Sequence, residues 1–265
     1  MIIGLVDIVI PTYKTPAKVL NAAVLSALAQ THQKINVIVV NDYPIKKLEI
    51  SKHPWLDNEN VTLVQNNQKM GSAEARNVAI AYSKGEFIAF LDADDLWHPQ
   101  KLEKQIDFMK YNGFGASCTG YLAVDKKNKI RFSVKPFQNL SQTKLWLTTN
   151  VSCSSVVLDK KQISQSPLMK PYRHSHDTVL WSEIIQQTRF GGYKHPLTLY
   201  RIGHESATSS RLKTVRYNYE VFRRENGFCF GTMFWVSYLI FAILKRQNIL
   251  SNSKNEINDL WPDLV

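Results

Sequence analysis

Short apolar runs and helical periodicities follow one another through the N-terminal part of the chain. Apolar runs at residues 5–10, 35–40 and 86–91 predict buried strands, and residues 61–65 predict a weaker one. Apolar spacing predicts helices over about 15–30, 71–82 and 98–111, and each of them follows one of these strands. Thr15 is the expected cap of the first helix, with Pro16 at its first position, and His98 and Pro99 begin the last one.

The C-terminal part has a more mixed pattern. Residues 115–124 and 130–134 predict a hairpin, residues 151–158 a strand, residues 176–190 a helix and residues 193–202 an extended segment. From residue 213 onward the pattern is helical, with an interruption near Gly227. The alternation of strands and helices predicts an α/β fold with a mostly parallel sheet.

Polar clusters follow three of the predicted strands directly. They are Thr12-Tyr13, Asn41-Asp42 and the acidic run 92–95. Because ligands bind at the carboxyl ends of strands in such sheets, we expect these clusters to form one site. Asp92 and Asp94 stand two apart, so in an extended segment both carboxylates point the same way, and their oxygens suit Mg²⁺ or Mn²⁺. The alternative is that one aspartate caps the next helix and the others are solvated.

Composition narrows the class of protein. The chain has 265 residues, of which 44% are apolar, so it is long enough and apolar enough for a packed core. Its net charge of +11 favours an anionic partner, such as nucleic acid, an acidic membrane surface or a phosphorylated substrate. Three scattered cysteines fit a reducing compartment, and the N-terminal apolar run is too short for a signal peptide, so we expect a cytoplasmic protein.

With these motifs in view, the chain resembles family 2 glycosyltransferases of the GT-A fold over about residues 5–205. The matching segments occur in order: 8–13 (IVIPTY), 37–42 (VIVVND), 71–77 (GSAEARN), the acidic strand end with Trp97 and Pro99, 176–181 (HDTVLW), and Tyr200-Arg201. Two positions depart from the family pattern, because Asn41 and His176 stand where acids are usual. Residues 186–190 (QQTRF) are similar to a motif of processive synthases, but they follow Asp177 too closely, so we expect one sugar per encounter.

The resemblance implies a Rossmann-like domain with a mixed central sheet, and it implies a role for each matched residue. The metal, Mn²⁺ or Mg²⁺, would be held by Asp94 with Asp92, and Asp177 would be the catalytic base. Arg76 would reach the base or the diphosphate, and Asp92 would lie near the ribose. The expected donor-binding residues are Pro11, Thr12, Tyr13, Asp42, Arg76, Asp92, Arg201 and His204.

The chemistry that these roles imply is an inverting transfer from a UDP-sugar, with glucose or galactose favoured. The metal and cationic groups neutralise the leaving diphosphate, and one carboxylate deprotonates the acceptor hydroxyl, so an α-linked donor gives a β-glycoside. The implied acceptor is a lipid-linked or lipopolysaccharide-type saccharide, as in bacterial O-antigen or capsule synthesis. From the residues alone, the alternatives are that Asp177 only caps a helix, that Arg76 is a surface charge and that Tyr13 is a packed aromatic residue.

The tail after residue 210 contains an uncharged apolar segment between basic residues. Residues 227–244 carry no charge and are rich in aromatic residues, and basic residues flank them on both sides. This pattern favours a helix lying in a membrane interface, although packing on the core and a short membrane span are alternatives. We therefore expect a catalytic domain over 1–210, with a nucleotide-sugar half (1–112) and an acceptor half (113–210). Residues 211–265 would be a helical tail that holds the enzyme at the cytoplasmic face of the inner membrane.

Two other functions remain open from the residues alone. A nucleotidyltransferase on a similar sheet would also need a nucleotide and a metal, but it would need no base at Asp177. A nucleic-acid-binding protein is suggested only by the charge, and the basic residues are dispersed rather than set in a stripe with aromatic residues, so we expect no nucleic-acid partner.

Overall fold

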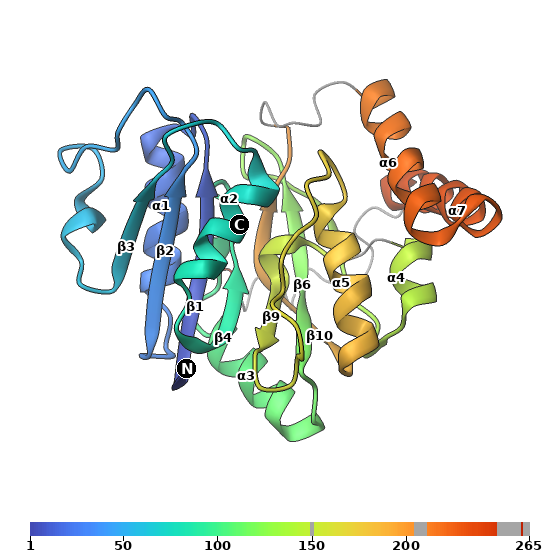
Figure 1. Cartoon of the computed structure of the whole chain (residues 1–265), viewed down its shortest axis with the longest axis horizontal. Coiled ribbons are helices and arrows are strands. Elements are labelled where there is room, and N and C mark those ends of the chain that lie inside the picture. The colour runs from blue at the N-terminus through green and yellow to red at the C-terminus, as the bar shows by residue number, and fades with distance from the viewer. Residues whose placement is uncertain (149–150, 204–210, 248–260, 262–265) are drawn as a thin grey trace.

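The computed structural model describes residues 1–148, 151–203, 211–247 and 261, and helices cover both faces of its central sheet (Figure 1). The strands are β1 (Ile2–Thr12), β2 (Ile35–Asn41), β3 (Val61–Gln65), β4 (Gly85–Phe90), β5 (Leu96–Trp97), β6 (Ala116–Val124), β7 (Ile130–Val134), β8 (Asn139–Leu140), β9 (Val156–Asp159) and β10 (Phe190–Arg201). The helices are α1 (Ala17–Leu28), α2 (Ser72–Tyr82), α3 (Lys101–Asn112), α4 (Gln142–Thr148), α5 (His176–Gln187), α6 (Arg211–Asn226) and α7 (Phe228–Gln247), with short 3₁₀ turns η1 (Pro54–Asp57) and η2 (Cys153–Ser155). The predicted α/β class is confirmed.

A single sheet joins the two expected halves of the catalytic domain. Its strands lie in the order β3-β2-β1-β4-β9-β6-β10-β5, while β7 pairs with β6 and β8 with β10. β1 is parallel to β2 and β4, β2 to β3, and β10 to β6. β9 is antiparallel to both of its neighbours, β4 and β6. The sheet is therefore mixed, with an all-parallel N-terminal part.

Each face of the sheet is covered by its own hydrophobic core. Val6, Ile8 and Ile10 of β1 pack with residues of α1 and α3, whereas Val9 packs on the other face with residues of α2 and α5. All four side chains are fully buried, and their alternation follows the two-residue period of a strand. Side chains on both faces of β1 are packed, and β1 pairs with β2 and β4. The packing of β1 therefore also holds the ends of these two neighbouring strands in place.

The predicted strand over 151–158 is wrong in its first half. The chain first makes the turn η2, in which the backbone N–H and the Oγ of Ser155 both donate to the carbonyl of Ser152, at 3.0 and 2.6 Å. These bonds compete with strand pairing, which begins only at Val156.

Helix boundaries also differ from the prediction. The helix expected to reach about residue 190 ends at Gln187, because Phe190 already pairs with Ala116 in the sheet. α1 begins at Ala17, so Pro16 occupies the capping position in place of Thr15, and α3 begins at Lys101.

The described part of the tail folds back on the catalytic domain. α6 and α7 pack together, and α7 also packs on α4, around Trp146, Phe222 and Phe234. The other side of α7 is open: Phe228, Phe230, Met233, Val236 and Ile240 are each between 43% and 67% exposed. None of the helices within the described ranges combines the length and the apolarity that a membrane crossing requires. Residues 248–260 and 262–265 lie outside the described part.

Candidate active site

The ends of β1, β2 and β4 meet at one edge of the sheet, as the three polar clusters predict. The backbone N–H of Asp42 donates to the carbonyl of Thr12 at 2.8 Å, and that of Leu91 donates to Val9 at 3.0 Å. Thr12, Asn41 and Asp42 are buried. The parallel arrangement therefore brings the clusters together, although they are far apart in the sequence.

Asp42 ties the end of β2 to the start of α2. Its Oδ1 accepts hydrogen bonds from Asn66 Nδ2 and the Met70 N–H, both at 2.9 Å, and its Oδ2 accepts one from the Gly71 N–H at 2.8 Å. Gly71 has φ 93°, a left-handed conformation that suits glycine, and α2 begins at the next residue. The carboxylate thus shapes the loop that leads into α2, and its expected role in donor binding stays a prediction.

Tyr13 lies at this edge with its ring partly open to solvent. It meets Tyr43 edge-on at 5.5 Å between ring centroids, and the Lys69 ammonium lies 4.2 Å from the Tyr13 ring centroid. The next residue, Lys14, has φ 56°, an uncommon value for a residue with a side chain. An exposed aromatic ring flanked by cations suits a base that carries phosphates.

The acidic run after β4 is held in place by Ser154 of η2. Its Oγ accepts from the Asp92 N–H at 3.0 Å and donates to Asp95 Oδ2 at 2.5 Å. Asp95 is fully buried, and its Oδ1 accepts from the Arg201 N–H at 2.9 Å. Burial, followed by the charges of Asp92 and Asp94, raises the pKa of Asp95 well above its ordinary value. Sequence reasoning included Asp95 in the acidic run without giving it a role of its own, and it missed Ser154, because no local pattern marks a serine so far along the chain.

The donor set fits one divalent cation shared with a substrate. Asp92 and Asp94 supply carboxylate oxygens. After burial, their negative charges raise the pKa of Asp95, and a cation bound here would reduce this repulsion. Within the described ranges, no three His, Cys, Asp or Glu side chains are grouped to hold a metal by themselves. Mg²⁺ is commonly held by one or two carboxylates together with substrate phosphates, so two aspartates suffice.

Arg76 of α2 connects this acidic edge to α5. It is buried; its Nη2 forms an ion pair with Asp92, and its Nη1 donates to His176 Nε2 at 2.9 Å and to the Ser72 carbonyl at 3.3 Å. Burial opposes the charge, but Asp92 outweighs it and raises the pKa of Arg76, so the guanidinium stays charged. The sequence suggested Arg76 as a donor contact and did not foresee its bond to His176.

His176 is buried between Arg76 and the preceding loop. Burial, and then the charge of Arg76, lower its pKa, so the ring is neutral at pH 7. Because Nε2 accepts from Arg76, Nδ1 carries the proton and donates to the Tyr172 carbonyl at 3.2 Å. A neutral histidine therefore links α2 to the loop that precedes α5.

Asp177 stands in the first turn of α5, partly exposed. Its Oδ1 accepts from the Thr178 N–H at 2.8 Å. The residue before the helix, Ser175, has φ 56° and donates through Oγ to Asn218 Oδ1 of α6 at 3.0 Å. The uncommon backbone conformation of Ser175 and its bond to α6 fix where α5 begins, and so where the Asp177 carboxylate lies.

Arg201, at the end of β10, contacts the acidic run. Its Nη1 donates to the Asp94 carbonyl at 3.2 Å, and its backbone N–H donates to Asp95. His204, expected beside it, lies outside the described residues.

Two cavities flank this edge, and neither is lined by Asp92, Asp94 or Asp177. One of about 250 Å³ lies between the ends of β1 and β2 and the 43–53 loop, and it is lined by Thr12, Tyr43, Lys14, Lys46 and Lys52 among others. The other, of about 130 Å³, lies between the 171–174 loop and α6. The first suits the nucleotide side of a donor, because its lysines favour phosphates.

Comparison with solved structures defines the class. The structure superposes with S. aureus TarS in complex with UDP-GlcNAc at a TM-score of 0.67 and 12% identity, covering 98% of this chain and 80% of that one. It superposes with the mannosyltransferase PcManGT from Pyrobaculum calidifontis, in complex with GDP-Man and Mn²⁺, at 0.63 and 14%, covering 96% and 78%. The fold is that of GT-A glycosyltransferases.

Sequence comparison gives the family. The model of glycosyl transferase family 2 matches residues 7–170, and the chain belongs to this family. It is 28% identical over 254 residues to the Escherichia coli UDP-Glc:alpha-D-GlcNAc-diphosphoundecaprenol beta-1,3-glucosyltransferase WfgD, covering 94% of this chain and 98% of that protein. It is 29% identical over 250 residues to the putative teichuronic acid biosynthesis glycosyltransferase TuaG of Bacillus subtilis, covering 91% and 97%. The family resemblance is confirmed.

Proposed function

We propose that this glycosyltransferase moves one sugar from a UDP-sugar to a saccharide that a diphosphate links to a membrane lipid, with inversion at the anomeric carbon. UDP-glucose is the donor that we favour, because WfgD, similar over nearly its whole length, is named for it. The observation that carries the proposal is the Arg76 bridge, which joins Asp92 at the end of β4 to His176 beside Asp177.

The donor occupies the edge formed by β1, β2 and β4. Its base lies against the residues at the end of β1 and near Asp42, and its diphosphate faces the acidic run. Asp94 and Asp92 would hold the cation, Mn²⁺ or Mg²⁺, and the chemistry that it would supply there is neutralisation of charge on the departing diphosphate. Arg76 keeps the Asp92 carboxylate oriented through its ion pair. The proposed donor contacts are Pro11, Thr12, Tyr13, Asp42, Arg76, Asp92, Arg201 and His204.

Asp177 acts on the acceptor. Its carboxylate takes the proton of the acceptor hydroxyl while that oxygen bonds to the anomeric carbon, and the bond from this carbon to the UDP oxygen breaks. Attack from the face opposite the leaving group turns an α-linked donor into a β-glycoside.

We place the enzyme against the anionic cytoplasmic face of the inner membrane. Its net charge of +11 and the open apolar side of α7 support this position. A lipid-linked acceptor also requires that the site lie close to a membrane.

Calorimetric titration with UDP, GDP and dTDP, each with and without Mn²⁺, tests the donor site. We expect Mn²⁺-dependent binding of UDP, which Asp94→Ala abolishes. Asp177→Asn should keep UDP binding and lose transfer by about 10²–10⁴-fold, because it removes the base alone.

Asp107→Asn, an exposed aspartate of α3, is the matched control and should change neither quantity. Transfer by Asp177→Asn at the parent rate would exclude Asp177 as the base. Mn²⁺-independent UDP binding that survives Asp94→Ala would exclude the proposed metal site.

A further inference from the structure

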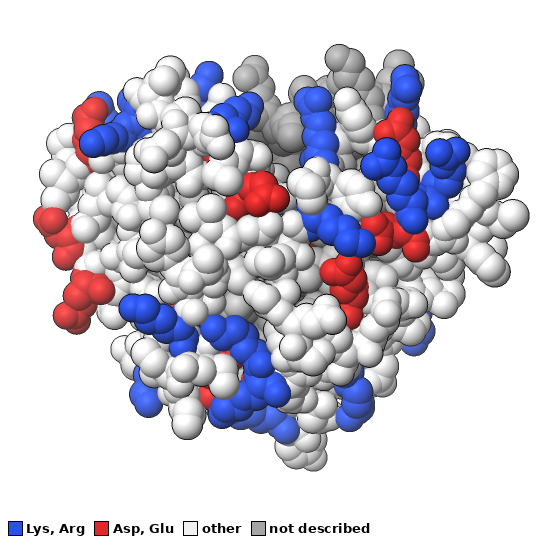
Figure 2. Space-filling model, viewed as in Figure 1, with Lys and Arg blue, Asp and Glu red and all other residues white. Residues whose placement is uncertain are grey.

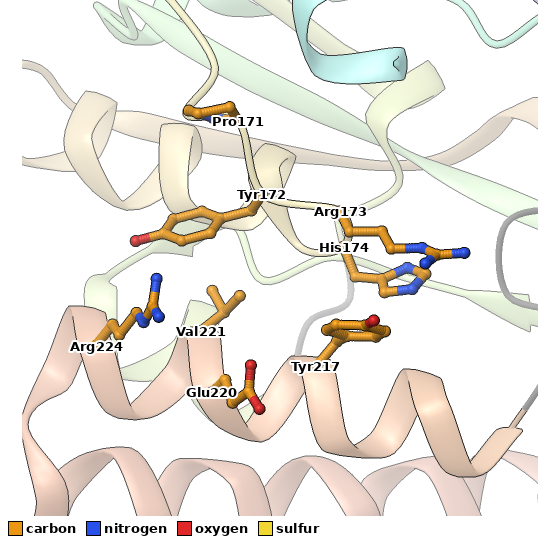
Figure 3. Close-up of a pocket in the computed structure, with 8 residues that line it drawn as sticks. All are labelled: Pro171, Tyr172, Arg173, His174, Tyr217, Glu220, Val221 and Arg224. Carbon is orange, nitrogen blue, oxygen red and sulfur yellow. The ribbon is translucent and has the colours of Figure 1, made fainter. Parts of the chain in front are cut away.

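The cavity of about 130 Å³ beside α6 has a basic lining that the donor site does not use. It lies between the loop that precedes α5 and one face of α6 (Figure 3). Arg173 and Arg224 stand at opposite ends of it, with His174 and Tyr217 beside Arg173 and the Tyr172 ring on the side of Arg224 (Figure 3). Lysine and arginine side chains also gather on the molecular surface over α6, with acidic side chains among them (Figure 2).

Both guanidinium groups at this cavity lack a carboxylate partner among the described residues. Arg173 lies over the ring of Tyr217, with 5.4 Å from Cζ to the ring centroid, and both arginines are exposed. Glu220, the acidic residue of the lining, pairs with Arg216 at 3.4 Å. The cavity therefore keeps a net positive charge, and guanidinium groups bind phosphate oxygens with paired hydrogen bonds.

The cavity lies between the loop that precedes α5 and α6, and α6 in turn packs on α7 (Figure 3). On one side, the Tyr172 carbonyl accepts a hydrogen bond from His176 at 3.2 Å, next to Asp177. On the other side, Asn218 of α6 donates to Tyr238 Oη of α7 at 3.3 Å. The cavity is therefore close to the proposed base, and α6 stands between the cavity and α7.

We propose that this cavity binds the diphosphate of the lipid-linked acceptor. The inference rests on the proposed function, and it assigns a place to the part of the acceptor between sugar and lipid. A cavity of about 130 Å³ is smaller than the roughly 300–1,000 Å³ of sites that enclose drug-sized ligands, so it suits a diphosphate and excludes a whole nucleotide. The sugar then extends toward Asp177 and the lipid toward α7.

Titration of the protein with inorganic pyrophosphate tests the binding directly. A metal chelator is present so that the donor site cannot bind pyrophosphate through a cation. We expect the double variant Arg173→Ala/Arg224→Ala to lose affinity by about tenfold or more, since each substitution removes a charged hydrogen-bonding partner. Arg223→Ala is the matched control, because Arg223 is exposed beside Arg224 and does not line the cavity. Pyrophosphate binding that is absent from the parent protein, or unchanged in the double variant, overturns the inference.

Kinetics with two acceptors test whether the group that binds in the cavity is the diphosphate of the acceptor. One acceptor carries its sugar on a lipid diphosphate, and the other carries the same sugar on an uncharged glycoside of the same lipid. We expect the double variant to raise KM for the first acceptor by about tenfold, leaving KM for the second and for the UDP-sugar unchanged. Equal effects on both acceptors overturn the inference. Absence of UDP binding or of transfer in the parent protein contradicts the proposed function instead, so the two failures are distinguishable.

Discussion

Lys101 is a fully buried lysine near the acidic edge. Its ammonium lies 3.8 Å from the centroid of the Trp97 ring, and its Nζ has no hydrogen-bond partner among the described residues. Burial lowers the pKa of this ammonium well below its ordinary value, because the charged form loses its hydration. Burial of Lys101 therefore lowers the free energy of unfolding by an amount that depends on pH.

The unfolded chain keeps this lysine protonated up to about pH 10.4, whereas the folded chain binds fewer protons there. The free energy of unfolding should therefore rise with pH, by up to about 1.4 kcal/mol per pH unit, in the part of the range between the folded and unfolded pKa values. We expect denaturant unfolding to show this rise as the pH approaches the unfolded value of about 10.4, and Lys101→Met to flatten it. An unchanged slope in Lys101→Met would mean that Lys101 stays charged in the folded protein.

At the scale of elements, η2 and the end of β4 depend on each other. Ser154 accepts from the backbone of Asp92 and donates to Asp95, and its own carbonyl accepts from Trp97 Nε1 at 2.7 Å. One turn from the middle of the chain therefore fixes the loop that carries the proposed metal ligands.

Ser154→Ala removes the two bonds made by the hydroxyl and leaves the Asp95 carboxylate with one partner fewer. We expect the free energy of unfolding to fall by about 1–3 kcal/mol and Mn²⁺-dependent UDP binding to weaken. Ser155→Ala, which removes one bond within η2, is the control and should leave UDP affinity unchanged. Equal UDP affinity in both variants would show that the acidic loop keeps its shape without Ser154.

The sequence predicted the strand ends well and their cross-connections poorly. Thr12, Asp42 and Asp92 are adjacent to apolar runs, so their place at one edge follows from local pattern and the rules of parallel sheets. The bond between Arg76 and His176 joins residues with no pattern in common, and the serine turn at η2 follows from side-chain hydrogen bonds that periodicity does not record. Local signals therefore predicted the fold class and the polar edge of the sheet, and tertiary contacts determined the rest.

At the scale of the whole molecule, α7 presents an apolar side that nothing in the described chain covers. Met233, Val236 and Ile240 follow helical spacing on this side, and their side chains are 47%, 43% and 52% exposed. A single patch of this kind on a basic protein suits an anionic bilayer surface.

Replacing these three residues by serine should reduce binding to vesicles that contain anionic lipid by about tenfold or more, because apolar contact with the bilayer is lost. Co-sedimentation with the vesicles measures the effect. The control is Tyr111→Ser, which changes a side chain 91% exposed on α3. Undiminished vesicle binding by the triple variant would show that this side of α7 does not contact the bilayer.

The position of β9 has a consequence for how the protein is made. This strand lies between β4 and β6 but is synthesised after both, so the two parts of the sheet cannot join until it has left the ribosome. At about 5–20 residues per second, the nascent chain carries unpaired edges of β4 and β6 for seconds. During that interval the acidic loop lacks Ser154, which arrives with the same segment. Exposed strand edges favour association with other chains, so these seconds are when a growing chain most needs a chaperone.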